Sequence, residues 1–152
     1  MRIGVISDTH GLLRPEALQA LAGVNHILHA EDVGDPKILS ALEAIAPLTV
    51  IRGNIDRSGP CAALSATEIV DLGGTTFYLV HDLHELDLDP MAAGISVVIS
   101  GHSHKPLIER RRGVLYLNPG SAGPRRFSLP ITIGLVTLGK GSPQAEIIPL
   151  VR

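Results

Sequence analysis

The sequence is poor in several kinds of residue, and each shortage argues against a class of protein. There is no Trp, and aromatic residues make up 3% of the 152 residues, which leaves few side chains on which nucleic-acid bases could stack. The formal net charge is −2, so no overall positive charge attracts nucleic acid or an anionic membrane. We therefore expect neither nucleic acid nor a membrane among the partners.

Cysteine occurs once, as Cys61, which excludes an internal disulfide framework and a metal site built from cysteines. No apolar run approaches the roughly 18 residues needed to span a bilayer, and the N-terminus carries no recognisable secretory signal. A free thiol is compatible with a reducing compartment. We expect a cytoplasmic protein.

Hydrophobic residues make up 45% of the chain and charged residues only 18%, so a sizeable core can form and disorder is not expected. The length suits one domain over residues 1–152. Histidine occurs seven times, and most of these residues lie in short clusters with aspartate. That clustering is the most informative feature of the composition.

Hydrophobic patterning predicts a change of character along the chain. The first half alternates short apolar strands with helix-patterned segments, which indicates parallel pairing through right-handed crossovers. The second half is rich in hairpins, with turns at 73–74, near 112–113 and at 139–144. We predict an α/β fold with a β-sandwich core and helices outside. The predicted strands are 2–7, 26–30, 48–53, 67–72, 75–80, 95–100, 106–111, 113–118, 131–138 and 145–151, and the predicted helices are 15–23 and 36–46.

Polar clusters follow five of the predicted strands. Ligand sites in α/β sheets gather at the carboxyl ends of strands, so these clusters are expected to meet at one edge. Imidazole together with carboxylate and amide oxygen suits divalent manganese, iron, zinc or nickel. The clusters are Asp8-Thr9-His10, His29 with Asp32, Gly53-Asn54-Ile55-Asp56, His81-Asp82 and Gly101-His102-Ser103-His104.

Each cluster by itself also has an ordinary structural explanation. Asp8 and His10 could form a turn with an exposed histidine, and Gly53-Asn54 is a common turn dipeptide. A single histidine such as His81 is more often exposed or hydrogen-bonded than a ligand. The order of the clusters, each after an apolar strand, is what favours a metal centre.

That order resembles the calcineurin-like metallophosphoesterase superfamily, and within it the small single-domain prokaryotic phosphodiesterases related to the retromer subunit of eukaryotes. The likeness covers nearly the whole chain and implies a four-layer αββα metallophosphoesterase sandwich. It rests on SDTHG (7–11), HAEDV (29–33), RGNID (52–56), VHD (80–82), SGHSHKP (100–106) and LNPGS (117–121).

The resemblance implies a two-metal centre that activates water for in-line attack on a phosphate ester, most often a phosphodiester. Its common metal is Mn²⁺, with Zn²⁺, Fe²⁺ or Ni²⁺ also compatible, and its substrate a small-molecule phosphate ester. The alternative is a weakly catalytic or non-catalytic protein-binding scaffold on the same fold, and a homo-oligomer stays open. By position, the first metal would be held by Asp8, His10 and His104, the second by Asn54, His81 and His102, and both by Asp32; the catalytic set would be Asp8, His10, Asp32, Asn54 and His102.

Two aspartates near the second strand could provide the bridging ligand. Asp32 lies two residues beyond Ala30, where the predicted strand ends. Asp35 precedes Pro36 and a helix-patterned stretch, which is typical of an N-cap followed by proline in the first turn. Because Asp35 has a complete structural explanation, we predict that Asp32 binds metal and Asp35 caps a helix.

Two acids depart from the pattern of the family. Glu31 stands where the family usually has glycine, and Asp82 where it often has glycine. Glu31 could point outward without effect, or it could add a carboxylate near the metals and repel an anionic substrate. We hypothesise that the two acids lower phosphoesterase activity or shift its substrate, and a Glu31→Gly, Asp82→Gly double variant tests this.

Several other residues are candidates for a role in the reaction. Ile55 stands where many relatives carry a histidine that acts as a general acid, and His84 is a substitute or simply an exposed histidine. Asp56 could hold a ligand through a hydrogen bond. The pair Arg125-Arg126 could reach a substrate phosphate, whereas Arg110–Arg112 are expected to decorate a hairpin. Ser121 has no base beside it in the sequence, which argues against a serine nucleophile.

Overall fold

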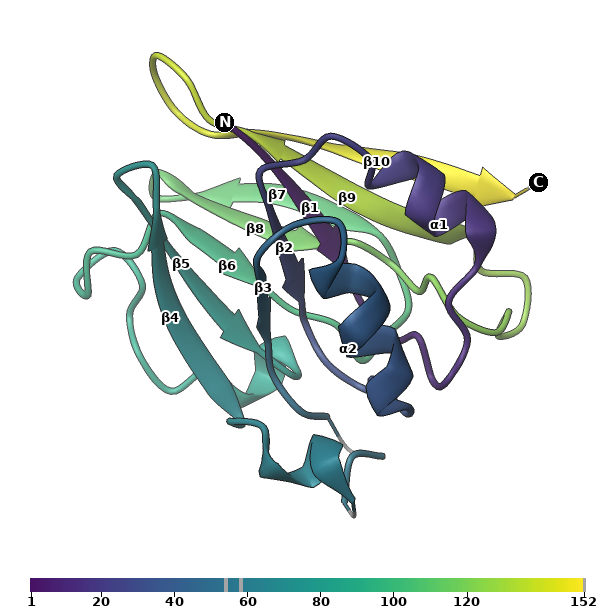
Figure 1. Cartoon of the computed structure of the whole chain (residues 1–152). Helices are drawn as coiled ribbons and strands as arrows, with labels where there is room; N and C mark the ends of the chain where they lie inside the picture. Colours follow the sequence, from purple (N-terminus) through teal and green to yellow (C-terminus); the bar gives the residue numbers. More distant parts are fainter. Residues whose placement is uncertain (54, 58, 152) are drawn as a thin grey trace.

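The computed structural model describes residues 1–53, 55–57 and 59–151. Two five-stranded sheets pack face to face, and the helices α1 and α2 lie on the outer side of the first sheet (Figure 1). The strands are β1 (Arg2–Ile6), β2 (His26–His29), β3 (Leu48–Val50), β4 (Thr67–Leu72), β5 (Thr75–Val80), β6 (Val97–Ile99), β7 (Leu107–Arg111), β8 (Val114–Asn118), β9 (Ile131–Thr137) and β10 (Gln144–Val151). The helices are α1 (Pro15–Ala20) and α2 (Pro36–Glu43), with short 3-10 helices at Pro60–Ala63 and Leu83–Glu85.

The first sheet has the strand order β10-β9-β1-β2-β3. The pairs β1–β2 and β2–β3 are parallel, as the alternation of strands and helices predicts. The strand β9 joins β1 in the antiparallel sense and forms a hairpin with β10. Because β1, β2 and β3 run in one direction, the loops that follow them meet at one edge of the sandwich.

The second sheet has the strand order β4-β5-β6-β8-β7. The predicted hairpins β4–β5 and β7–β8 are both present and antiparallel. The strands β5, β6 and β8 are parallel neighbours. Their carboxyl ends therefore also lie together, so loops from both sheets can contribute to one site.

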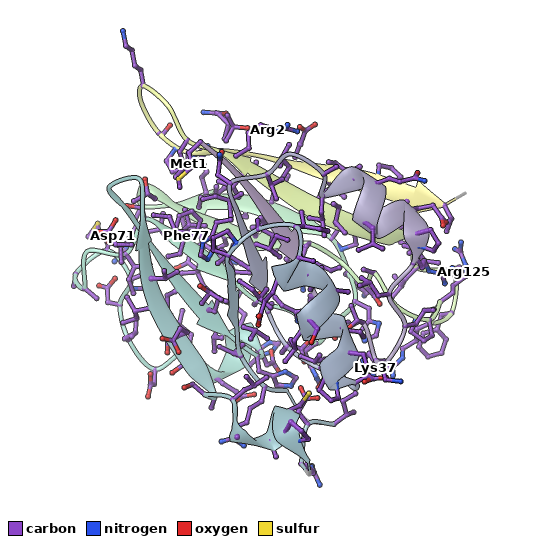
Figure 2. The ribbon with its side chains drawn as sticks, viewed as in Figure 1. Met1, Arg2, Lys37, Asp71, Phe77 and Arg125 are labelled. Atoms are coloured by element: carbon purple, nitrogen blue, oxygen red, sulfur yellow. The ribbon has the colours of Figure 1, made fainter. Side chains whose placement is uncertain are left out.

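Alternating side chains from both sheets fill the space between them. Ile3 and Val5 of β1 point inward, as do Phe77 and Leu79 of β5, and all four are fully buried. Figure 2 labels Phe77 within this layer between the sheets. Each such side chain contributes about 1.5–3 kcal/mol through removal from water. This core holds the two sheets at a fixed spacing and so fixes the distance between their loops.

The outer face of the first sheet is covered by the two helices. Ile38 and Leu42 lie four residues apart on one side of α2, and both are buried against the sheet. Leu21, which follows α1, packs over Gly4, where a Cβ atom would collide with the leucine side chain. Proline occupies the first turn of both helices, as predicted.

The outer face of the second sheet is covered differently. Tyr78 and Tyr116 pack there beneath Leu83, Leu86 and Leu88. The predicted α/β sandwich is confirmed, but within the described chain its fourth layer is the segment 83–95, which contains a 3-10 turn rather than a long helix.

Several elements end earlier than the sequence predicts. The helix α1 ends at Ala20 rather than 23, α2 at Glu43 rather than 46, and β3 at Val50 rather than 53. After β3 the chain keeps one hydrogen bond to β2, in which Ile51 N donates to His29 O at 3.2 Å, and then leaves the sheet. This early departure carries Gly53 and Asp56 toward the loop that follows β2.

Candidate metal centre

The loops after β1 and β2 stay hydrogen-bonded beyond the strands themselves. The backbone N–H of Asp8 donates to Glu31 O at 3.1 Å, and that of His10 donates to Asp32 O at 3.0 Å. This continued pairing holds the two polar loops side by side. The loops after β5 and β6 bring in His81, His102 and His104 from the second sheet.

The first predicted ligand group converges on Asp8. Asp8 Oδ1 lies 3.3 Å from His104 Nε2 and 3.7 Å from His10 Nε2. The carboxylate of Asp8 is fully buried and His104 nearly so, while His10 is partly exposed. The three residues that were assigned to the first metal by position are therefore neighbours in space.

The second predicted group is also brought together, as far as the structure describes it. The rings of His81 and His102 lie 4.7 Å apart between centroids. His81 lies with Asp32 and Glu31 in a buried group whose ligand atoms are all within 4.8 Å of one another. Asn54, the remaining residue assigned to this metal, lies outside the described residues.

Asp32 lies between the two groups. Its Oδ2 is 3.7 Å from His10 Nε2, on the side of the first group. It is also a member of the group formed with Glu31 and His81. Its Oδ1 accepts a hydrogen bond from the N–H of Ile55 at 3.0 Å, which fixes the orientation of the carboxylate.

Many of these ligand atoms are buried without a hydrogen-bond partner among the described residues. Buried polar groups are normally hydrogen-bonded, so such a concentration needs an explanation. A divalent cation satisfies imidazole nitrogen and carboxylate oxygen at once, and the donor set therefore fits the predicted metals. The unpartnered atoms are Asp8 Oδ1, His10 Nε2, Glu31 Oε2, His81 Nδ1, His81 Nε2 and His104 Nδ1.

The backbone of the site is held in an uncommon conformation. Of the seven described non-glycine residues with positive φ, five belong to the predicted ligand set. Residues other than glycine adopt this region at a cost, and such strain concentrates at functional sites. The five are Asp8 (φ 57°), His10 (φ 47°), Asp32 (φ 50°), His102 (φ 71°) and His104 (φ 62°).

The electrostatics of the site separate two neighbouring carboxylates. Burial raises the pKa of Asp8, but the interactions of its carboxylate with the nearby His10 and His104 imidazoles outweigh it and hold that pKa well below its ordinary value. Burial, together with the nearby Asp8, raises the pKa of Glu31 far above the usual range for a glutamate. The nearby Asp8 carboxylate in turn raises the pKa of His10. Without a cation, the surroundings therefore favour the ionised form of Asp8 and oppose that of Glu31.

Glu31 points into the site, which answers the question that the sequence left open. Its side chain is fully buried, and Oε2 lies 2.6 Å from His81 Nδ1. Glu31 is not among the residues with positive φ, so its backbone angle imposes no strain. Of the two alternatives for Glu31, the structure excludes the outward direction and supports the inward one, because Ser7, His81 and the backbone of His102 enclose its carboxylate.

Asp82, the second departure from the family pattern, is partly exposed. Its Oδ1 accepts from the backbone N–H of His84 at 3.1 Å, and its Oδ2 lies 3.8 Å from His102 Nε2. Burial raises the pKa of Asp82, but the bonds to His84 outweigh it and leave that pKa below the ordinary value. The His84 side chain is 96% exposed, as expected for a surface histidine.

Two further polar residues support the ligand loops. Asp56 is buried and accepts from three backbone N–H groups, those of Val33, Gly34 and Gly53, each at 3.0 Å. It thereby ties the loop after β2 to the loop after β3, as the proposed hydrogen-bonding role for Asp56 implies. The sequence did not identify Asn118, whose Nδ2 donates to Gly101 O at 3.1 Å and steadies the GHSH loop.

Asp35 caps α2 as predicted. Its Oδ1 accepts from the backbone N–H of Lys37 at 2.9 Å, and Pro36 takes the first helical position. Figure 2 labels Lys37 near the start of this helix. The prediction for Asp35 is confirmed, and this aspartate is occupied with the helix rather than with the ligand groups.

Two cavities flank the ligand groups. A cavity of about 270 Å³ is lined by His10, His104 and the segment 124–126, which includes Arg125 and Arg126. Figure 2 shows Arg125 on the loop that leads back toward β9. A second cavity, of about 340 Å³, adjoins His81 and Gly53 on the other side. The first cavity therefore has imidazole and guanidinium groups in its lining.

Two arginines of the β7–β8 hairpin bind neighbouring groups. Arg111 forms an ion pair with Glu109 at 2.8 Å and lies over the Tyr116 ring. Arg110 donates to Pro143 O. Ser121 Oγ donates to Asp8 O at 3.2 Å, so its hydroxyl supports the loop after β1.

Comparison with known proteins agrees with this fold and this set of residues. Residues 1–141 match the calcineurin-like phosphoesterase superfamily domain. A protein of Methanothermobacter thermautotrophicus named "Probable metallophosphoesterase" is 37% identical over 164 residues, which cover 97% of this chain and 92% of that protein. The chain therefore belongs to the calcineurin-like phosphoesterase superfamily.

Solved structures show the same fold at lower identity. Wild-type Vps29 from Entamoeba histolytica, complexed with Zn²⁺, superposes with a TM-score of 0.74 at 22% identity, over 99% of this chain and 100% of that chain. A structure described as a novel archaeal phosphodiesterase gives a TM-score of 0.75 at 21% identity, over 97% and 100%. The expected likeness both to prokaryotic phosphodiesterases and to the retromer-related protein is confirmed at the level of fold.

Across the described residues, no helix has the length and apolar character required to cross a membrane.

Proposed function

We propose that this chain is a hydrolase that cleaves phosphate esters, preferentially phosphodiesters, with the help of two divalent metal ions. The observation that supports the proposal most directly is the convergence of buried, unpartnered imidazole and carboxylate atoms from four loops. Asp8, His10 and His104 form one group, and Asp32 links it to His81. Superfamily membership supports the same chemistry.

The proposed ligand assignments follow those groups. Asp8, His10 and His104 would hold one ion, His81 and His102 with Asn54 the other, and Asp32 both. When bound, the ions would neutralise phosphate charge, acidify an attacking water and stabilise the leaving oxygen. The superfamily resemblance favours Mn²⁺, while the mixed nitrogen and oxygen donors also suit Zn²⁺, Fe²⁺ or Ni²⁺.

Substrate binding is proposed for the cavity beside His10 and His104. Arg125 and Arg126 line it, and a guanidinium group can bind the oxygens of a phosphate in a bidentate manner. This arrangement would draw the phosphate toward the ligand groups. We propose a small-molecule phosphate ester as the substrate, since the cavity of about 270 Å³ is small.

The candidate site offers little for protonation of the leaving group. Ile55 cannot donate a proton, and His84 is highly exposed and bonded to Asp82. Among the groups assigned to the site, none stands out as a general acid. We therefore propose that the preferred substrates release a weakly basic alcohol or phenol that needs little protonation.

A second function is favoured by a different surface. The strand β7 is an edge of the second sheet, and its Leu107 and Ile108 are exposed. Exposed apolar residues on an edge strand suit pairing with another chain. The alternative function is therefore a protein-binding scaffold with weak or no catalysis, and a homo-oligomer formed through this edge is one version of it.

The two functions are separated by a direct assay. We propose that residues 1–152 form one domain and that the protein is cytoplasmic. In the assay, the protein is loaded with Mn²⁺, and the hydrolysis of bis(p-nitrophenyl) phosphate is compared with that of p-nitrophenyl phosphate. Faster turnover of the diester supports the proposed function. No turnover of either ester with Mn²⁺, Zn²⁺, Fe²⁺ or Ni²⁺, despite bound metal, would favour the scaffold.

A further inference from the structure

Glu31 places a third carboxylate inside the candidate metal centre. Its side chain is fully buried, between the loop after β1 and the loops after β5 and β6. The carboxylates of Asp8 and Asp32 lie close to it, and both raise the pKa of Glu31. Three carboxylates in so small a buried space repel one another unless positive charge lies among them.

One oxygen of Glu31 is anchored by the protein. Oε1 accepts from the backbone N–H of His102 at 2.8 Å and from Ser7 Oγ at 3.3 Å. The room for the side chain comes from Gly53 and Gly101, where an added Cβ atom would collide with the Glu31 carboxylate. The carboxylate is therefore held in one orientation by groups from three loops.

The other oxygen is aimed at His81 but is not hydrogen-bonded to it. Oε2 lies 2.6 Å from Nδ1 of the buried His81, yet neither atom has a hydrogen-bond partner among the described residues. The contact between the two atoms is short, but its geometry is not that of a hydrogen bond. Two electron-pair donors that face the same point, with Asp32 within 4.8 Å, are arranged as ligands of a common cation.

We propose that Glu31 is an additional metal ligand, which shares a divalent cation with Asp32 and His81 in the second half of the centre. The inference rests on the proposed two-metal function and adds to it a ligand that the superfamily pattern does not contain. A further carboxylate makes this half of the centre harder and more negative. Glu31 therefore strengthens the binding of Mn²⁺ rather than merely repelling the substrate.

The experiment measures binding of Mn²⁺ alone to the full chain, without substrate. Protein treated with a chelator and then dialysed is titrated with Mn²⁺ by calorimetry, and bound metal is counted by elemental analysis. The variants are Glu31→Gln, which keeps the shape and removes the charge, and Glu31→Gly, which restores the superfamily pattern. Asp35→Asn is the matched control, because it neutralises a nearby carboxylate that caps a helix.

The expected result is that the wild type binds two Mn²⁺ ions. Each Glu31 variant should bind one of them at least tenfold more weakly and the other nearly unchanged, while Asp35→Asn matches the wild type. Thermal melting in chelator checks folding, and Glu31→Gln should melt no lower than the wild type, since glutamine keeps the shape and the oxygen that accepts from the His102 N–H. If one variant does not fold, the other decides the question.

Mn²⁺ binding by both folded Glu31 variants as tight as that of the wild type, or tighter, would overturn the inference. Glu31 would then be a metal-free partner of His81 that fills the space. The outcome is separate from the proposed function: weakened Mn²⁺ binding without any ester hydrolysis supports the ligand and contradicts the enzyme. Hydrolysis with unchanged Mn²⁺ binding in the variants contradicts only the ligand.

Discussion

Asp32 Oδ2 lies 3.7 Å from His10 Nε2, whereas the carboxylate of Asp35, three residues along the same loop, accepts a hydrogen bond from the N–H of Lys37. The two aspartates are thus separated by structure as well as by sequence. Asp32 is buried between both ligand groups, and Asp35 caps the start of α2.

This separation predicts opposite effects of the same substitution. Asp32→Asn should reduce bound Mn²⁺ from two ions to one or none. It should also lower kcat/KM for a phosphodiester at least about 100-fold, because loss of a residue that only hydrogen-bonds to a metal ligand already costs about 10- to 100-fold. Asp35→Asn should keep both metal and activity, since asparagine caps a helix nearly as well and costs less than about 0.5 kcal/mol. Metal analysis and steady-state kinetics measure both. Equal losses in the two variants would contradict the assignment of roles.

Asp56 should matter for metal binding although it is not in the predicted ligand set. Its carboxylate accepts from the backbone N–H groups of Val33, Gly34 and Gly53. Asp56→Asn turns an amide donor toward at least one of these donors, which should cost about 1–3 kcal/mol of unfolding free energy. Because Asp56 positions the loop of Asp32, Mn²⁺ affinity should fall about 10- to 100-fold.

Urea unfolding in chelator and Mn²⁺ titration of the Asp56 variant measure the two effects separately. Asp71→Asn is the matched control, because Asp71 is exposed on β4 at a distance from the ligand groups. It should leave both quantities unchanged. An Asp56→Asn protein with normal stability and normal Mn²⁺ affinity would show that the loops are held by other contacts.

Arg126 is predicted to bind the substrate phosphate. Arg126→Ala should raise KM for a phosphodiester about tenfold, through loss of a charge-assisted contact of about 1.5 kcal/mol, and should change Mn²⁺ affinity little. Lys140→Ala removes the same charge from the exposed turn before β10 and serves as the control. Steady-state kinetics with both variants test the assignment, which is contradicted if Arg126→Ala and Lys140→Ala have the same KM.

Much of this architecture was predictable because its determinants are local. The run of apolar residues in β1 and β5 specifies buried strands, and Asp35-Pro36 specifies where α2 begins. The order of the polar clusters after these strands placed Asp8, His10, Asp32, His81, His102 and His104 at one edge. The structure brings these residues together, and their roles as ligands stay predictions.

Other features depend on contacts between distant loops and carry no local signal. The direction of the Glu31 side chain is decided by space that Gly53 and Gly101 leave and by the N–H of His102, which lies 71 residues away. The contacts of Asn118 with the GHSH loop arise in the same way. The fourth layer could not be foreseen because segment 83–95 covers Tyr78 and Tyr116 with scattered leucines rather than with a helical pattern.

The fully buried His29 predicts a loss of stability in acid. Thr9 Oγ donates to Val33 O at 2.9 Å, so the contact of 3.0 Å with His29 Nε2 requires that the imidazole donates. The other nitrogen, Nδ1, has no partner among the described residues. Burial lowers the pKa of His29 to about 4, because a second proton would have to be placed on that buried nitrogen.

Proton linkage gives the direction in which stability changes with pH. Between pH 6.5, the pKa in the unfolded chain, and about 4, the unfolded state binds more protons than the folded state, so stability falls as the pH is lowered. The full loss of unfolding free energy is about 3 kcal/mol, and no loss from His29 occurs above the pKa of the unfolded chain. His29→Gln keeps a donor toward Thr9 without titrating, so its urea unfolding free energy in chelator should fall less between pH 7 and pH 5. Parallel pH profiles would contradict a role for His29.

Removal of metal should destabilise the fold, because Asp8, Glu31 and Asp32 then lie together in a buried site without a cation. Mn²⁺ at about 100 times its dissociation constant stabilises the folded state by about 2.7 kcal/mol for each independent site, which raises Tm by on the order of 5–10 °C in a chain of this size. Melting curves with chelator, with Mn²⁺ and with Mg²⁺ measure the shift.

His104→Ala removes a nearly buried imidazole 3.3 Å from Asp8 and should reduce the Mn²⁺-dependent rise in Tm, whereas His84→Ala, at an exposed position, should leave that rise unchanged. A Tm that does not respond to Mn²⁺ in the wild type would mean that these buried carboxylates are neutralised by protons alone.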